Sequence, residues 1–200
     1  MLPLTTPLTL VQQPQPFTDP DWLFEVKHDG FRSLAQIHDG CRLVSRKGNE
    51  YRRKRLLELA GALSAVTHDV VLDGELVCLD DDGRSLFYDM MFHRETAYFY
   101  AFDILWLDGD DLRDRPLLER KQILRQITSA GPGRLLYVDH IEAEGERLFA
   151  QVCQRDMEGV VCKPKLSPYK VLRGKSPWIK IKNPAYTQAE GRGDLFHPSG

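Results

Sequence analysis

The chain contains the string EVKHDGFR at residues 25–32, in which a β-type run ends at Lys27 and the turn pair Asp29-Gly30 follows. Asp-Gly pairs favour tight reversals between antiparallel strands. The runs on either side, WLFEVK at 22–27 and FRSLAQIH at 31–38, therefore predict two short neighbouring strands. We expect the motif residues of this stretch to lie at strand ends and turns.

The rest of the chain continues this mixture of short strands and helices. Helical spacing of the apolar residues Leu56, Leu59, Ala60, Leu63 and Val66 predicts a covering helix over 53–66. Further helices are predicted over 116–127, where Pro116 suits a first turn, and over 142–153. Because strands and helices do not alternate regularly, we predict an α+β fold with antiparallel sheets flanked by helices. The remaining predicted strands are CRLVSR at 41–46, DVVLDGELVCL at 69–79, AYFYAFDILWL at 97–107, EGVVCK at 158–163 and WIKIKN at 178–183.

The composition fits one globular domain. The chain has 200 residues, of which 42% are hydrophobic and 28% charged, enough for one proper core. Residues 1–20 are rich in Pro, Gln and Thr and predict an extended arm on the surface, followed by the domain at 21–190 and a polar tail at 191–200.

No stretch of the sequence predicts a membrane span or a secretory signal. We therefore expect a cytoplasmic protein without a membrane partner. The cysteines at 41, 78, 153 and 162 form no C-x-x-C pair, which argues against a disulfide framework and a zinc ribbon and favours reduced thiols.

The charges are unevenly distributed, although the net charge is only −2. Seven Lys or Arg residues and no acid lie between Lys163 and Lys182, and a second basic run at 52–55 follows Arg46 and Lys47. Most charge runs are simply solvated faces, so this distribution supports binding of a polyanion without requiring it.

Six motifs occur in a fixed order. Alone, KHDG at 27–30 would be weak, but it is followed by SRKG (45–48), LDGELV (72–77), FDIL (102–105), EGVVCK (158–163) and WIKIK (178–182). In this order they resemble the motif series of the covalent nucleotidyltransferases, which include DNA ligases, RNA ligases and mRNA capping enzymes. The resemblance covers about 19–196. It is strongest to bacterial ATP-dependent DNA ligases, and implies their adenylation-domain fold with ATP-grasp-like sheets.

The residue types suit this chemistry independently of the resemblance. An amine that attacks the α-phosphate of ATP must be neutral, and lysine loses its proton readily in a desolvated or cation-rich pocket. Lys27 fits this role. The developing charge on the phosphates needs cations, which Lys163, Lys180 and Lys182 would supply. Strand alternation places Lys180 and Lys182 on one face, although such lysines could also protect an exposed sheet edge.

Carboxylates in the motifs suggest a magnesium site. Mg²⁺ needs only a few carboxylates beside the ATP phosphates, and Glu75 and Glu158 are the main candidates, followed by Asp29. A structural pairing of Glu75 is the alternative. By resemblance, Glu25 contributes to recognition of adenine or ribose, Arg32 and Arg46 contact ribose or phosphate, and Phe102 stacks on the base. Without the resemblance, Phe102 would be read as a core residue.

The resemblance implies an ATP-dependent ligase acting on nicked duplex DNA in repair or recombination, through a lysyl-AMP intermediate. An RNA ligase, acting on RNA-containing substrates, and a non-catalytic nucleotide- or nick-binding module are the alternatives. The sequence contains no segment resembling the OB-fold domain that follows this core in most relatives. We therefore expect weak, salt-sensitive DNA binding, and a protein partner could supply the role of that domain.

Overall fold

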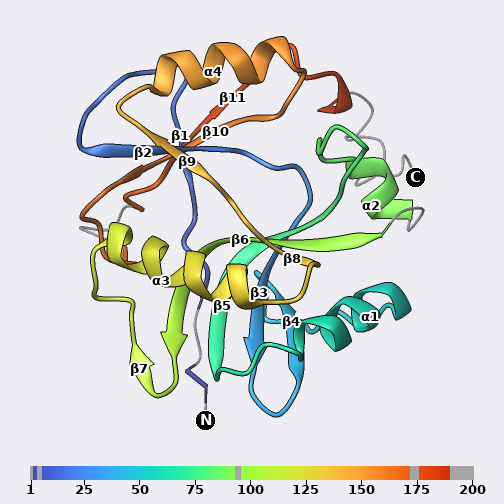
Figure 1. The fold of residues 1–200 in the computed structure, drawn as a ribbon. Helices are drawn as coiled ribbons and strands as arrows, with labels where there is room; N and C mark the ends of the chain where they lie inside the picture. The colour runs from blue at the N-terminus through green and yellow to red at the C-terminus, as the bar shows by residue number, and fades with distance from the viewer. Residues whose placement is uncertain (1, 4–5, 93–95, 172–175, 190–200) are drawn as a thin grey trace.

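The computed structural model describes residues 2–3, 6–92, 96–171 and 176–189, which form two β-sheets (Figure 1). In the first sheet the strands lie in the order β1 (Val11–Gln12), β11 (Ile179–Lys182), β10 (Gly159–Pro164), β2 (Trp22–Val26) and β9 (His140–Glu142). In the second sheet the order is β4 (Cys41–Ser45), β3 (Phe31–Ile37), β5 (Val70–Cys78), β6 (Ala97–Leu107) and β7 (Asp110–Asp111), and β8 (Leu135–Tyr137) also pairs with β6.

Helices cover the two sheets. Helix α1 (Lys54–Leu63) and α3 (Leu117–Ala130) pack on the second sheet, α2 (Phe87–Phe92) contacts β5, and α4 (Gly145–Gln154) packs on the first sheet. A short 3₁₀ turn follows at Thr187–Ala189. Strand pairs are antiparallel except β1 with β11 and β6 with β8. The predicted α+β fold with antiparallel sheets and flanking helices is therefore confirmed.

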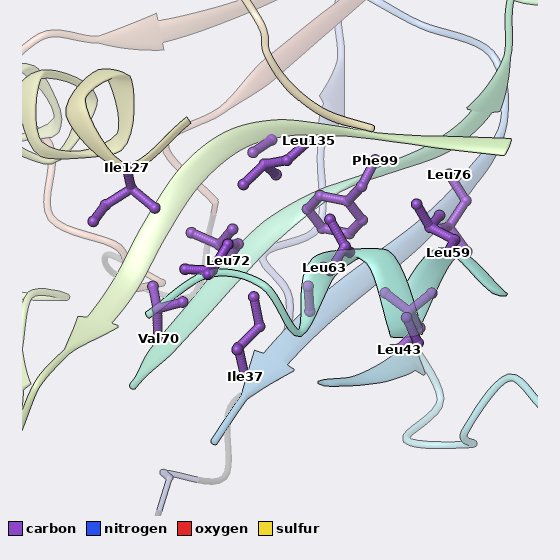
Figure 2. Packing of buried hydrophobic residues seen from close by; sticks show 14 of the residues in the cluster. Ile37, Leu43, Leu59, Leu63, Val70, Leu72, Leu76, Phe99, Ile127 and Leu135 are labelled. Atoms are coloured by element: carbon purple, nitrogen blue, oxygen red, sulfur yellow. The ribbon is translucent and has the colours of Figure 1, made fainter. Parts of the chain in front are cut away.

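The largest apolar cluster lies between the second sheet and its helices. Figure 2 shows side chains of β3, β4 and β5 meeting Leu59 and Leu63 of α1, with Ile127 of α3 at the edge. Alternation explains the arrangement, because Leu72 and Leu76 of β5 point into this cluster while Val71 belongs to a separate cluster on the opposite face. The predicted stripe is confirmed for Leu56, Leu59, Ala60 and Leu63, which are buried, whereas the helix ends at Leu63 and not at the predicted Val66, which is buried after the helix.

The prediction of a tight reversal at Asp29-Gly30 is wrong. Strand β2 pairs with β9 and β10, whereas β3 pairs with β4 and β5, so residues 27–30 cross from one sheet to the other. Gly30 is needed for close approach, since a Cβ at this position would lie 2.1 Å from the carbonyl oxygen of Leu76. Another Asp-Gly pair, Asp39-Gly40, does join neighbouring antiparallel strands, with positive φ angles of 49° and 121°.

We expect Gly30→Ala to destabilise the protein by about 2–3 kcal/mol, because backbone would have to move to relieve the overlap with β5. Chemical denaturation measures this change. Gly61→Ala is the matched control, since a Cβ there meets nothing within 4 Å on helix α1 and should be neutral or stabilising. Equal stability of the two variants would contradict the close approach.

Several elements were not predicted. Helix α4 begins later than the predicted 142 because residues up to Glu142 form β9 against β2. Strands β7 and β8 and helix α2 are also additional. The predicted arm adds β1 to the first sheet, and its Leu8 is buried. The predicted tail at 191–200 lies outside the described residues. In the described part of the chain, no helix has the length and apolarity needed to cross a bilayer.

Candidate active site

Strand alternation directs polar side chains of the first sheet away from α4. Phe24 and Val26 of β2 pack in the cluster beneath α4, so Glu25 faces the opposite side. The same holds for β10 and β11, where Cys162 and Ile181 pack toward α4. In the pairing register Val161 stands beside both Glu25 and Lys180, and Gly159 stands beside Lys182.

A pocket that opens to solvent lies between the two sheets. The residues around it come from β2 and β10 on one side and from β3, β5 and β6 on the other, so that motifs far apart in sequence meet here. The lining residues are Leu10, Glu25, Val26, Lys27, His28, Arg32, Glu75, Phe102, Val138, Val161, Lys163 and Trp178.

Lys27 is held at the edge of this cavity by its backbone and its side chain. Its N–H donates to the carbonyl oxygen of Gly159 at 2.9 Å, and its Nζ donates to Glu158 Oε2 at 2.6 Å. Lys27 and Glu158 also line a second, smaller recess that includes Asp29 and Tyr186. The ammonium group therefore lies where the two hollows meet.

The predicted metal-binding carboxylates gather around Lys27. Burial raises the pKa of Glu75 to about 7, and the negative charges of Glu158 and Asp29 act in the same direction, while Lys27 and Arg32 oppose the rise. Asp29 accepts a hydrogen bond from Tyr186 Oη at 2.7 Å. Carboxylate oxygens are the donor type that Mg²⁺ prefers, and Mg²⁺ commonly completes its shell with water and phosphate. Within the described ranges, however, no three or more His, Cys, Asp or Glu side chains come together in a group that could hold a metal ion.

An aromatic and cationic group forms the far wall. Phe102 meets Trp178 edge-on with ring centroids 6.0 Å apart, and the Arg32 guanidinium lies 4.7 Å from the Phe102 centroid. Arg32 donates two hydrogen bonds to the buried carboxylate of Asp73, at 2.8 and 2.7 Å. Tyr169 Oη donates to the same carboxylate at 2.5 Å. This network fixes the guanidinium beside an aromatic face.

Glu25 is buried between two lysines. Its carboxylate lies 2.5 Å from Lys163 Nζ and 2.6 Å from Lys121 Nζ. Burial lowers the pKa of Lys163 to about 8, and the neighbouring Lys121 adds to this effect, while Glu25 opposes it. Lys163 Nζ also lies 4.6 Å from the ring centroid of Phe102 and 4.1 Å from that of Trp178. The cation is thus part of the pocket wall and not of an exposed edge.

The other predicted cations lie nearer the surface. Lys180 is partly buried and Lys182 is exposed on the same strand face. Burial lowers the pKa of Lys180, and the positive charges of Lys182, Lys27 and Arg46 add to this effect while Glu158 opposes it. Arg46 therefore belongs to the same electrostatic neighbourhood, together with Lys27.

Sequence reasoning missed Lys121, Asp73, Trp178 and His28 as site residues. Lys121 had a detectable signal, because it lies on the same helical stripe as Leu117, Leu124 and Thr128, where a solvent-facing lysine is not expected. His28 stacks on Tyr100 with centroids 4.2 Å apart, and burial together with Lys27 lowers its pKa to about 4. No feature of the sequence indicated that His28 would stack on Tyr100.

Comparison with known proteins agrees with this architecture. Residues 9–182 match the profile of a family described as "ATP dependent DNA ligase domain". The multifunctional non-homologous end joining protein LigD of Mycolicibacterium smegmatis is 37% identical over 164 residues, which cover 80% of this chain and 21% of that protein. The SPbeta prophage-derived DNA ligase-like protein LigB of Bacillus subtilis is 27% identical over 192 residues, covering 92% of this chain and 69% of LigB.

A solved structure shows the same fold. The mycobacterial DNA ligase D complexed with ATP and MES superposes with a TM-score of 0.76 at 31% identity, covering 88% of this chain and 60% of that one. This chain spans about a fifth of the length of the LigD protein it resembles. With the profile match extending over most of its residues, the chain belongs to the family of ATP-dependent DNA ligase domains.

Proposed function

We propose that this domain captures AMP from ATP on Lys27 and passes it to the 5′-phosphate of nicked duplex DNA. The single observation that carries the proposal is the position of Lys27 where the buried pocket meets the carboxylates Glu75 and Glu158. A binding module would need no nucleophile at this point. Roles in DNA repair and recombination follow as expectations from the end-joining function named in the LigD relatives.

The first step forms one bond and breaks another. The Nζ–P bond forms at the α-phosphorus as the P–O bond to the leaving pyrophosphate breaks, and Nζ gives up a proton. In this proposal Glu158 accepts that proton, and the 2.6 Å contact between Nζ and Oε2 supports the assignment. Lys163, Lys180 and Lys182 line the same sheet face and would stabilise the negative charge that develops on the phosphates.

The remaining wall of the pocket is suited to the nucleoside. Phe102 offers an aromatic face for the base, Glu25 offers hydrogen-bond acceptors, and Arg32 is fixed by Asp73 to reach ribose or phosphate. Bound Mg²⁺ would neutralise phosphate charge beside Glu75 and Glu158, with Asp29 as a further carboxylate at this end. Arg46 extends the cationic surface outward from Lys180.

The AMP would next move to a 5′-phosphate, and the adjacent 3′-hydroxyl would displace it to seal the nick. A partner protein that helps hold the DNA is compatible with this sequence of steps. The test is to incubate the protein with magnesium and α-labelled ATP and to look for label that survives denaturation, and then to add nicked duplex DNA and measure sealing. Absence of covalent label with and without DNA would overturn the proposal.

RNA ligation remains the second candidate, because the chemistry on the 5′-phosphate is the same and depends on no feature that reads the sugar. Matched nicked substrates with a deoxyribose or ribose 3′-terminus distinguish the two. We expect faster sealing of the DNA nick.

A further inference from the structure

Lys121 is a buried lysine for which neither the family motifs nor the proposed chemistry gives a role. It projects from α3 and is 1% exposed. Its Nζ donates to Glu25 Oε1 at 2.6 Å and to the carbonyl oxygen of Val138 at 2.7 Å, and it lies 4.2 Å from the ring centroid of Tyr137. The ammonium group therefore makes two hydrogen bonds and one cation–π contact.

The two acceptors that Lys121 holds both line the nucleotide pocket, whereas Lys121 itself does not. Glu25 belongs to β2 of the first sheet. Val138 follows β8 and is fixed to the second sheet by its N–H, which donates to the carbonyl oxygen of Ala101 at 2.9 Å. The ammonium group of Lys121, which lies behind the pocket wall, therefore sets the distance between the Glu25 carboxylate and the Val138 carbonyl. These two acceptors belong to different sheets.

Neither acceptor is saturated by its contacts to the lysines. An ionised carboxylate has about four acceptor sites and a carbonyl oxygen has two, so the contacts to Lys121 and Lys163 do not exhaust them. Burial alone would raise the pKa of Glu25, but Lys121 and Lys163 outweigh it and hold the pKa below its ordinary value. Glu25 therefore remains an acceptor near neutral pH and does not become a donor.

We propose that Lys121 is a positioning residue for base selection, which holds Glu25 and the Val138 carbonyl as a pair of acceptors for the exocyclic amine of adenine. The inference rests on the proposed capture of AMP from ATP. A base with a carbonyl at the same position, such as hypoxanthine or guanine, would place an oxygen against these acceptors and leave them unpaired, which is strongly unfavourable in a buried site.

A purely structural lysine would behave differently. If Lys121 only neutralised Glu25 to stabilise the fold, its loss would lower the melting temperature and reduce use of all purine nucleotides equally. If it positions the acceptors, its loss lowers the preference for adenine over hypoxanthine while the rate with saturating ATP changes little. The discriminating quantity is the ratio of kcat/KM for ATP to that for ITP.

The experiment compares wild type with Lys121→Met, Lys121→Arg and the control Arg125→Met, using covalent labelling kinetics with ATP and ITP. Arg125 is the matched control because it contacts the same Tyr137 ring from the next turn of α3, is exposed, and pairs with Asp139 instead of Glu25. We expect Lys121→Met to raise the KM for ATP roughly tenfold, to lower the ATP-to-ITP ratio at least about fivefold and to leave kcat within about twofold.

The expected result for Lys121→Arg is a smaller fall in the ATP-to-ITP ratio, because charge is kept while the guanidinium fork cannot reproduce the same two contacts. Arg125→Met should match wild type. An unchanged ratio in folded Lys121→Met overturns the proposal, as does an unchanged ratio in Lys121→Arg if the methionine variant does not fold. If wild type forms no adenylate, the proposed function fails, and equilibrium binding of ATP and ITP to the same variants, followed by intrinsic tryptophan fluorescence, still tests Lys121.

Discussion

Replacing Lys27 by arginine is expected to lower the rate of covalent AMP attachment by ~10³-fold or more, while the protein stays folded. Arginine keeps a positive charge that can pair with Glu158, but a guanidinium does not lose its proton in proteins and so cannot attack the α-phosphorus. The fold is preserved because the substituted arginine can still form an ion pair with Glu158. Intact-mass measurement after exposure to ATP and magnesium detects the adenylate.

Lys27→Ala provides the complementary result. It also removes the nucleophile, but it leaves Glu158 without the lysine partner and close to Glu75 and Asp29, so we expect a further loss of stability of about 2 kcal/mol. Arg147→Lys, on the exposed part of α4, is the control for a conservative exchange of cations. Adenylate on the Lys27→Arg protein would show that another residue carries AMP.

The strands could be predicted well because each is a local property of the sequence. Period-two alternation indicates which residues of β11 share a face, and the structure does place Lys180 and Lys182 on the face opposite Ile179 and Ile181. The partner of a strand is not local. Strand β2 pairs with β10, which lies far from it in the sequence, and no turn close to β2 indicates this partner. The error at Asp29-Gly30 arose for this reason.

In the candidate site, too, local features could be predicted from the sequence and long-range contacts could not. The ordered motifs indicated Lys27, Glu75, Phe102 and Lys163 as members of one site, and all four line the same cavity. Their roles stay predictions. Asp73 and Lys121 act through other side chains, and such contacts depend on the relative placement of β3, β5, α3 and β2. The groups that contact a substrate are easier to recognise from a sequence motif than the groups that orient them.

The Glu75→Gln substitution is expected to stabilise the protein in the absence of ATP and metal while reducing adenylate formation at least about 100-fold. Glu75 faces the pocket from β5, and burial with Glu158 and Asp29 nearby raises its pKa from 4.5 to about 7. Above pH 7 the folded protein must hold this carboxylate ionised in an unfavourable site. Glutamine removes the charge at nearly the same volume, which we expect to be worth about 1–3 kcal/mol.

The pH dependence gives this prediction a definite sign. Between pH 4.5 and about 7, folded Glu75 binds more protons than unfolded Glu75, so its contribution to stability falls as the pH rises through this range and stays at its low value above it. The variant should thus match wild type near pH 4.5 and exceed it most above pH 7. Thermal unfolding with a chelator at pH 5 and pH 8 measures the difference, with Glu58→Gln on the exposed side of α1 as the control. A smaller advantage at pH 8 than at pH 5 would contradict the proposed environment of Glu75, and full adenylation by the variant would remove Glu75 from the phosphate end of the site.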